Sequence, residues 1–242
     1  MAARQVVPGL FVIATGIVNT FLIDHPDGCV LVDAGLPGRD ADILRAVEES
    51  GRRPTDIGHL IVTHAHPDHI GSLAALRSAT SATVYCHPAD APIVTAGGGF
   101  RPLRVTPGVV NWLVWRLFIR PILRRFEQVD PTPVDHPLYD GQVLPVAGGL
   151  TVLHAPGHCA GQVCLLWPRH GGVLLAADAA ANVFGLGLSA TYEDQTEGER
   201  QLRRLAALDF RVACFGHGKA IIGDAASQFR RRWPVDNALD AG

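Results

Sequence analysis

The sequence predicts an α/β protein in which two β-sheets pack face to face and helices cover both outer surfaces. Apolar and β-branched runs of strand length recur in both halves of the 242-residue chain. Segments with helical spacing lie between them, and glycine or proline separates most of the runs. Because each half contains strands for a sheet and helices to cover it, two sheets between two helical layers are expected.

The first half alternates between strands and helices. Residues 38–51 are expected to form a helix, since Ile43, Leu44 and Val47 have helical spacing and a glycine follows them. Residues 71–79 are expected to form a second helix. Strands are expected in five short apolar runs, at 9–15, 19–25, 29–35, 59–63 and 83–87.

The second half repeats this style. A helix is expected near residues 193–208, and another closes the chain. Strands are expected at 150–157, 161–168, 171–178 and 211–218. No internal repeat relates the two halves residue by residue.

Size and composition favour a single domain spanning residues 1–242. Of the residues, 48% are hydrophobic, and a chain of this length buries roughly three quarters of its unfolded surface. The net charge of −2 provides no broad basic face for nucleic acid. The five cysteines are scattered without a CxxC pair, which suits a reducing compartment. We therefore expect a cytoplasmic protein without nucleic-acid partners, signal peptide or transmembrane segment.

A helical insert is expected at about residues 97–137, between the two halves. Its central run, VVNWLVWRLFIRPILRRFEQ, mixes aromatic residues with four arginines, and Pro121 is expected to kink or split the helix. Several roles remain open for this helix. It could pack on the core, cover an apolar substrate pocket, form a homodimer contact or dock on a membrane surface.

Five apolar runs end in side chains that can bind a metal or transfer a proton. These side chains are Asp33, the group His64, His66, Asp68 and His69, then His158, Asp178 and His217. Groups at strand ends are held in place by a rigid scaffold. Five such coincidences in one chain indicate a common site.

The stretch THAHPDHIG, residues 63–71, has spacing that suits metal binding. His64 and His66 are two positions apart in an extended segment, so they project to the same side and can meet one ion. Asp68 and His69 follow Pro67, where the chain turns into a helix, so they can face a second position. Imidazole and carboxylate ligands suit Zn²⁺ or a similar divalent ion, and one carboxylate can bridge two ions.

These motifs resemble those of the metallo-β-lactamase superfamily. THAHPDHIG matches the HxHxDH motif of that family, and LVDAG, HAPGHCAGQ, AAD and FGHG look like its other motifs in the right order. The similarity covers essentially the whole chain apart from the insert. It implies an αββα four-layer sandwich with two divalent metal ions at one edge between the sheets. Zn²⁺ is the first choice, and Fe or Mn are alternatives.

The resemblance assigns roles to individual residues. It implies that His64, His66 and His158 bind one metal, that Asp68, His69 and His217 bind a second, and that Asp178 bridges both. Asp33, Thr63 and His154 are the candidates for orienting the ligating histidines. Trp112, Trp115, Phe118, Tyr139 and Tyr192 are the candidates for lining the substrate pocket.

The activity implied by the resemblance is metal-dependent hydrolysis. A water shared by two ions has its pKa lowered to ~7, and the resulting hydroxide would attack the carbonyl of a small ester, lactone or thioester with an apolar part. Asp68 would accept and return a proton. A nucleophile motif of the GxSxG type is absent from the sequence.

Three other functions stay open. A persulfide dioxygenase-like oxidoreductase would use one iron held by His64, His158 and Asp178. A true β-lactam hydrolase is disfavoured by the carboxylate of Asp178. The third is a metal-binding protein without catalytic activity.

Overall fold

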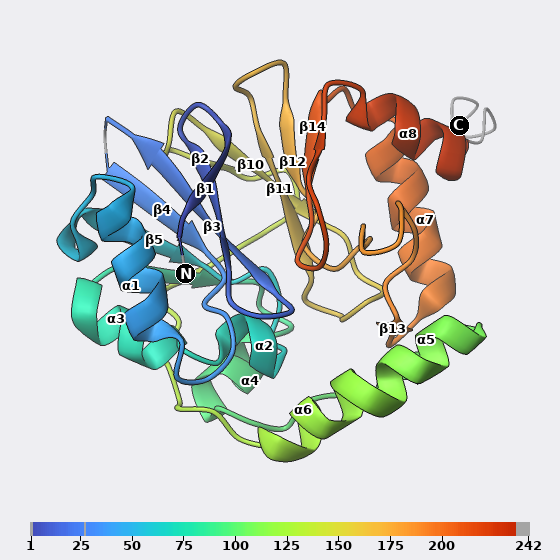
Figure 1. The fold of residues 1–242 in the computed structure, drawn as a ribbon, viewed down its shortest axis with the longest axis horizontal. Helices are drawn as coiled ribbons and strands as arrows, with labels where there is room; N and C mark the ends of the chain where they lie inside the picture. Colours follow the sequence, from blue (N-terminus) through green and yellow to red (C-terminus); the bar gives the residue numbers. More distant parts are fainter. Residues whose placement is uncertain (1, 27, 236–242) are drawn as a thin grey trace.

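Two sheets form the centre of the computed structural model, which describes residues 2–26 and 28–235 (Figure 1). Met1, Asp27 and residues 236–242, which the single-domain prediction includes, lie outside the described residues. The sheets stack face to face with helices on both outer surfaces, so the layer order is αββα.

The first sheet has seven strands in the order β1-β2-β3-β4-β5-β6-β8. The first four strands pair antiparallel and the remaining pairs are parallel. The strands are β1 (Arg4–Val7), β2 (Leu10–Ala14), β3 (Asn19–His25), β4 (Gly28–Val32), β5 (Ile57–Ile61), β6 (Thr83–Cys86) and β8 (His136–Pro137). All five strands expected in the first half are present, and β1 is an additional edge strand.

The second sheet has six strands in the order β15-β14-β12-β11-β10-β9. Its pairs are antiparallel except for the parallel pair β12 and β14. The strands are β9 (Val143–Leu144), β10 (Leu150–His154), β11 (Val163–Trp167), β12 (Val173–Leu175), β14 (Val212–Cys214) and β15 (Ile221–Ile222).

Alternating side chains divide the interior into apolar layers. In β4, Val30 and Val32 belong to the cluster between the two sheets, whereas Cys29 and Leu31 belong to the cluster under the first helical layer. Successive side chains of a strand point to opposite faces, so a strand between two covered faces is apolar throughout. A third cluster fills the space between the second sheet and its helices.

The helical layers follow the predicted pattern. Helices α1 (Asp40–Glu49) and α3 (Leu73–Thr80) pack on the first sheet, and α7 (Gln195–Ala206) and α8 (Ala225–Arg232) pack on the second. The shorter helices are the 3₁₀ turn at Pro54–Asp56, α2 (Pro67–Ile70) and α4 (Ala91–Ala96). Among the described residues, no helix has both the length and the apolar character needed to cross a bilayer.

The insert forms one long helix that crosses the lower edge of both halves in Figure 1. It consists of α5 (Val109–Val114), a π-helical stretch over Trp115–Ile119 and α6 (Arg120–Arg125). We refer to these three pieces together as the insert helix. Pro121 does not split it, because the wide π turn ends at Ile119, two residues before the proline, and Pro121 lies in the first turn of α6, where a missing backbone N–H is tolerated.

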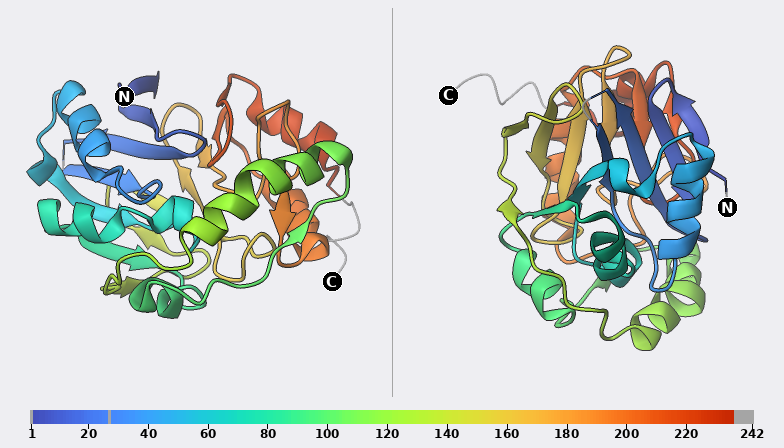
Figure 2. Two further views of the ribbon diagram at one scale, coloured as in Figure 1. Left: turned by 60° about the horizontal axis from the view of Figure 1, so that its bottom comes forward. Right: turned by 90° about the vertical axis from the view of Figure 1, so that its left-hand side faces the viewer.

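Two contacts attach the insert helix to the domain. Strand β7 (Arg104–Val105) pairs with β13 (Thr191–Tyr192) ahead of the helix, and α6 packs against α2. The left view of Figure 2 shows the same helix in front of both halves. The insert therefore contacts both halves of the chain, at α2 after β5 and at β13 after β12.

Candidate metal centre

The seven predicted metal ligands come together at one edge of the sandwich. His64 and His66 follow β5, and α2 carries Asp68 and His69. The second sheet supplies the other three, since His158 follows β10, Asp178 follows β12 and His217 follows β14. The ends of these strands reach the same edge, so residues up to 153 positions apart in the chain become neighbours.

Three histidines form the first group. The ring centroids of His64, His66 and His158 lie 4.7–4.9 Å apart, and each ring is close to perpendicular to the others. His66 Nδ1 lies 3.0 Å from His158 Nε2. Potential ligand atoms of these three histidines and of the buried Cys159 lie within 4.8 Å of one another, close enough to bind one ion.

Asp68, His69 and His217 form the second group. Asp68 Oδ2 lies 3.4 Å from His217 Nε2 and 3.8 Å from His69 Nε2. Potential ligand atoms of all three residues lie within 4.8 Å of one another.

Asp178 joins the two groups. Its Oδ1 lies 3.6 Å from His69 Nε2. Its Oδ2 lies 3.1 Å from His217 Nε2 and 3.6 Å from His158 Nε2. One carboxylate therefore contacts histidines of both groups, which is the arrangement that a bridging ligand requires.

The outward nitrogen of four histidines is held by a partner within the protein. His69 Nδ1 donates to Asp33 Oδ2 and His64 Nδ1 to Thr63 Oγ1, at 2.8 and 3.0 Å. The Nδ1 atoms of His158 and His217 donate to the carbonyl oxygens of Thr191 and Ile17, each at 2.7 Å. Each of these bonds fixes the ring orientation and leaves the lone pair of Nε2 directed inward.

Three buried atoms in the centre have no hydrogen-bond partner among the described residues. They are His64 Nε2, His69 Nε2 and Asp178 Oδ1. An unpartnered buried polar group costs about 1–3 kcal/mol, so three at one point need an explanation. Divalent cations bound between the two groups would satisfy all three atoms, and the nitrogen and carboxylate donors suit such ions.

The charges of the site also favour a bound cation. Burial opposes the charged form of His69, but Asp178, Asp33 and Asp68 outweigh it and raise the pKa of His69 to about 10. The pKa of His217 is likewise raised well above its ordinary value, against burial, by Asp178 and Asp68. Burial and the neighbouring His158 instead lower the pKa of His66 to about 3. Positive charge is therefore stabilised beside the two carboxylates.

Asp33 supports ligands of both groups. Besides the bond from His69, its Oδ2 accepts the Thr63 hydroxyl and its Oδ1 accepts the Thr63 backbone N–H, both at 2.8 Å. Thr63 in turn accepts from His64. Asp33 adopts a left-handed backbone conformation with φ of 64°, which Asp tolerates better than most residues.

His154 does not take the orienting position expected for it. Its Nε2 donates to the Ala160 carbonyl oxygen at 2.9 Å, and its ring stacks on His87 at 3.9 Å. In the described part of the chain no hydrogen bond joins it to a predicted ligand. His154 closes strand β10 four residues before His158, and at the strand end its side chain meets the surface.

Asp90 is a buried residue of this region that sequence reasoning did not identify. Its Oδ2 accepts the backbone N–H of Ala65, between His64 and His66, at 2.8 Å. Its Oδ1 accepts from Arg101, which also pairs with Glu193 at 3.3 Å. Asp90 follows strand β6, so the pattern of polar groups after strands could have identified it.

A cavity of about 460 Å³ lies beside His66. The insert supplies most of its wall, and the lining includes Phe100, Arg101, Pro102, Leu103, Trp115, Leu123 and Glu127. The cavity is thus largely apolar with one charge of each sign.

Only one of the five aromatic residues expected to line a substrate pocket lines this cavity, namely Trp115. Trp112, Phe118 and Tyr139 are each more than half exposed. Tyr192 is buried, stacks edge-on against His158 and donates its hydroxyl to the Ala179 carbonyl oxygen at 2.7 Å. The expectation is corrected for Trp112 and Phe118, because periodicity alone did not show which side of the insert helix faces inward. Tyr139 and Tyr192 lie outside this helix, and Tyr192 contacts the predicted ligand His158 instead.

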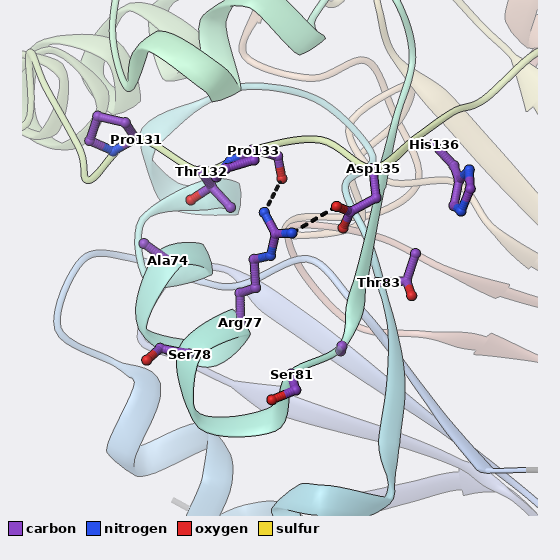
Figure 3. A pocket seen from close by; sticks show the side chains of 11 residues that line it. Ala74, Arg77, Ser78, Ser81, Thr83, Pro131, Thr132, Pro133, Asp135 and His136 are labelled. Atoms are coloured by element: carbon purple, nitrogen blue, oxygen red, sulfur yellow. Dashed lines mark hydrogen bonds and ion pairs between the residues drawn. The ribbon is translucent and has the colours of Figure 1, made fainter.

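A larger cavity of about 690 Å³ lies away from the ligands (Figure 3). None of the seven predicted ligands is among its lining residues. The side chain of Arg77 extends into it from α3 and bonds to the Pro133 carbonyl oxygen and to Asp135, each at 2.7 Å. These bonds attach the segment before β8 to the first helical layer.

Comparisons with known proteins agree with this geometry. Residues 13–217 match the family described as the metallo-beta-lactamase superfamily. The chain is 27% identical over 240 residues to the probable metallo-hydrolase YflN of Bacillus subtilis, covering 92% of this chain and 88% of that protein. It is 30% identical over 159 residues to the acyl-coenzyme A thioesterase MBLAC2 of Gallus gallus, covering 61% and 52%.

Solved structures share the fold. A beta-lactamase from Chitinophaga pinensis superposes with a TM-score of 0.71 at 22% identity, covering 96% of this chain and 89% of that one. At this identity the match establishes the αββα sandwich and not the substrate. The predicted fold is confirmed, and the chain belongs to the metallo-beta-lactamase superfamily, as a metallo-hydrolase of that family.

Proposed function

We propose that the protein holds two divalent ions, Zn²⁺ in the first instance, and hydrolyses small esters, lactones or thioesters that have an apolar acyl part. The observation that carries this proposal is the position of Asp178, whose two oxygens contact histidines of both groups. When bound, two such ions would acidify a water and polarise a carbonyl.

The protein's own residues would have separate tasks. His64, His66 and His158 would hold one ion, and His69, His217 and Asp68 the other. The side chains of Asp68 and His217 are 16% and 22% exposed, whereas His64, His66 and His69 are buried, so the Asp68 carboxylate can exchange a proton with a substrate that enters the site. Asp33 and Thr63 would keep the ligating rings in place.

The cavity beside His66 supports an apolar acyl group. Trp115, Leu123, Phe100 and Leu103 present aromatic and aliphatic surface next to a predicted ligand. Burying a methylene group stabilises binding by about 0.8 kcal/mol, so longer acyl chains should bind more tightly until the cavity is full. The name of MBLAC2, an acyl-coenzyme A thioesterase, is compatible with this substrate class.

A mononuclear-iron oxidoreductase is less well supported. Such a site would need two histidines and one carboxylate. Here Asp68, His69 and His217 form a second group, and both of its histidines contact Asp178. A single ion bound by His64, His158 and Asp178 would leave this group without a metal.

The test combines metal analysis with a substrate panel. Purified protein should contain about two Zn²⁺ per chain and hydrolyse acyl thioesters, aryl esters or acyl lactones with kcat/KM that rises with acyl length. His66→Ala should lose this activity. Trp115→Ala should flatten the dependence on acyl length while the shortest substrate reacts as before. One iron per chain, or equal turnover by His66→Ala, would refute the proposal.

A further inference from the structure

The insert helix presents apolar residues that the protein itself does not cover. Eleven of its seventeen residues are apolar and large, yet none of the seventeen is buried. The described residues include thirteen exposed large hydrophobic side chains, and six of them lie on this helix. They are Val109, Val110, Trp112, Leu113, Leu117 and Phe118. Contiguous exposed apolar surface of this kind marks an interaction site.

The same edge of the molecule carries further exposed apolar residues. Ile17, 43% exposed, accepts a hydrogen bond from His217 through its carbonyl oxygen. Val183 and Phe184, 54% and 83% exposed, follow Asn182, whose backbone N–H donates to the His217 carbonyl oxygen. Exposed apolar side chains thus also lie near the predicted ligand His217.

The charge of the insert helix identifies the partner. It contains Arg116, Arg120, Arg124 and Arg125 and no acidic residue. In the described part of the chain, no carboxylate forms an ion pair with any of these four. Four unpaired positive charges beside exposed tryptophan, leucine and phenylalanine complement the anionic headgroups and acyl boundary of a membrane leaflet.

A second copy of the chain fits this surface less well. A two-fold symmetric contact places the same surface patch on both sides. Eight arginines, four from each copy, would then lie in one interface, with no acidic residue of either helix to pair with them. Like charges in contact weaken such an interface.

We propose that the insert helix docks flat on an anionic lipid bilayer. Its apolar residues enter the boundary between headgroups and acyl chains, while the arginine side chains extend to the phosphates. The arginines hold the helix at the surface. Trp115 and Leu123 of the same helix line the cavity beside His66, so a membrane-dissolved acyl group would meet that cavity directly. This last consequence rests on the proposed hydrolase function, whereas the docking does not.

The experiment measures binding of the full metal-loaded chain to vesicles, without any substrate. Vesicles of phosphatidylcholine with phosphatidylglycerol are compared with vesicles of phosphatidylcholine alone by co-sedimentation. The protein should bind the anionic vesicles at least about tenfold more tightly, and 0.5 M NaCl should remove most of that preference. The net charge of −2 does not favour anionic vesicles, and the charge control below tests whether other arginines account for the binding.

Two pairs of substitutions locate the contact. Trp112→Ser with Phe118→Ser, and Arg116→Gln with Arg124→Gln, should each weaken vesicle binding about tenfold or more without changing metal content or thermal unfolding. The matched apolar control is Val143→Ser with Ile222→Ser, at residues 61% and 59% exposed on edge strands of the second sheet. The matched charge control is Arg200→Gln with Arg231→Gln on α7 and α8, both with exposed side chains.

Three results would overturn the proposal. The first is no binding to anionic vesicles, and the second is an equal loss of binding in the control variants. The third is a dimer in light scattering that dissociates with Trp112→Ser and Phe118→Ser, because a second copy would then cover the helix. Failure of hydrolysis alone would leave the vesicle result unaffected and would count against the proposed function instead.

Discussion

The metal-bearing edge and the insert helix lie next to each other but are held in opposite ways. At the edge, His64 and His69 are completely buried and Asp178 is 4% exposed. On the insert helix no residue is buried, and Leu117 is 60% exposed. The difference indicates that the chemistry is built on the rigid scaffold, while the insert is available for contacts outside the protein.

The cause lies in the strands. Five of the seven ligands follow a strand packed between two layers, and α2 carries Asp68 and His69 directly after β5, so the positions of the ligands are fixed by many contacts. The insert helix is attached through β7 and β13 and through α6 against α2. Changes at the edge should therefore have large effects on metal and activity, and changes on the helix should have small effects on the fold.

The largest effect is expected for Asp178→Asn. The amide is neutral and offers one acceptor, so it cannot bridge two cations between His158, His69 and His217. We expect kcat/KM to fall by about 10³-fold or more, which corresponds to about 4 kcal/mol, and the metal content to fall below two per chain. Metal analysis and steady-state kinetics check this. Asp209→Asn, at an exposed side chain, is the control, and full activity of Asp178→Asn would show that the carboxylate does not bridge.

A smaller loss is expected from Gly216→Ala, which removes no ligand. A Cβ at this position would lie 2.0 Å from Asp178 Oδ1 and 2.9 Å from His69 Cε1, so both side chains must move. Displacement of a positioned group by about 1 Å can cost about 10²-fold in rate. Gly58→Ala in β5, where a Cβ meets nothing within 4 Å, is the matched control. Unchanged metal binding in Gly216→Ala would mean that the side chains at this edge can shift more easily than their burial indicates.

Asp33→Asn should weaken metal binding, because Asp33 orients the rings of the ligating histidines. Asparagine tolerates the left-handed backbone and can still accept from the Thr63 N–H, but it lacks the charge opposite His69. We expect metal affinity to fall about 10–100-fold. Competition with a chromophoric chelator measures this, with Asp42→Asn on the surface of α1 for comparison. Equal affinities would restrict Asp33 to a structural turn.

The sequence allowed the edge to be predicted but not the pocket. The ligands could be found because each comes after an apolar run. Such runs predict strands from short stretches of sequence, and the ends of these strands meet at one edge of the sandwich. Asp90 was missed although it follows β6, because a single carboxylate near a helix start is common. The lining by Trp115 and Leu123 could not be predicted. It depends on how α6 packs against α2, and the periodicity of a helix with apolar residues on all sides does not show which side faces inward.

The smallest effect is expected on the insert helix. A Leu→Ala substitution there can be compared with the same substitution at a buried residue of α3. Leu117→Ala should change the free energy of unfolding by no more than about 0.5 kcal/mol, since Leu117 already contacts solvent. Leu76→Ala on α3, at a completely buried residue, should cost about 2–5 kcal/mol because it leaves a cavity under the first helical layer. Urea unfolding without lipid measures the free energy of unfolding of both variants. A loss at Leu117 as large as that at Leu76 would mean that the helix stabilises the core, and the contrast between the two regions would disappear.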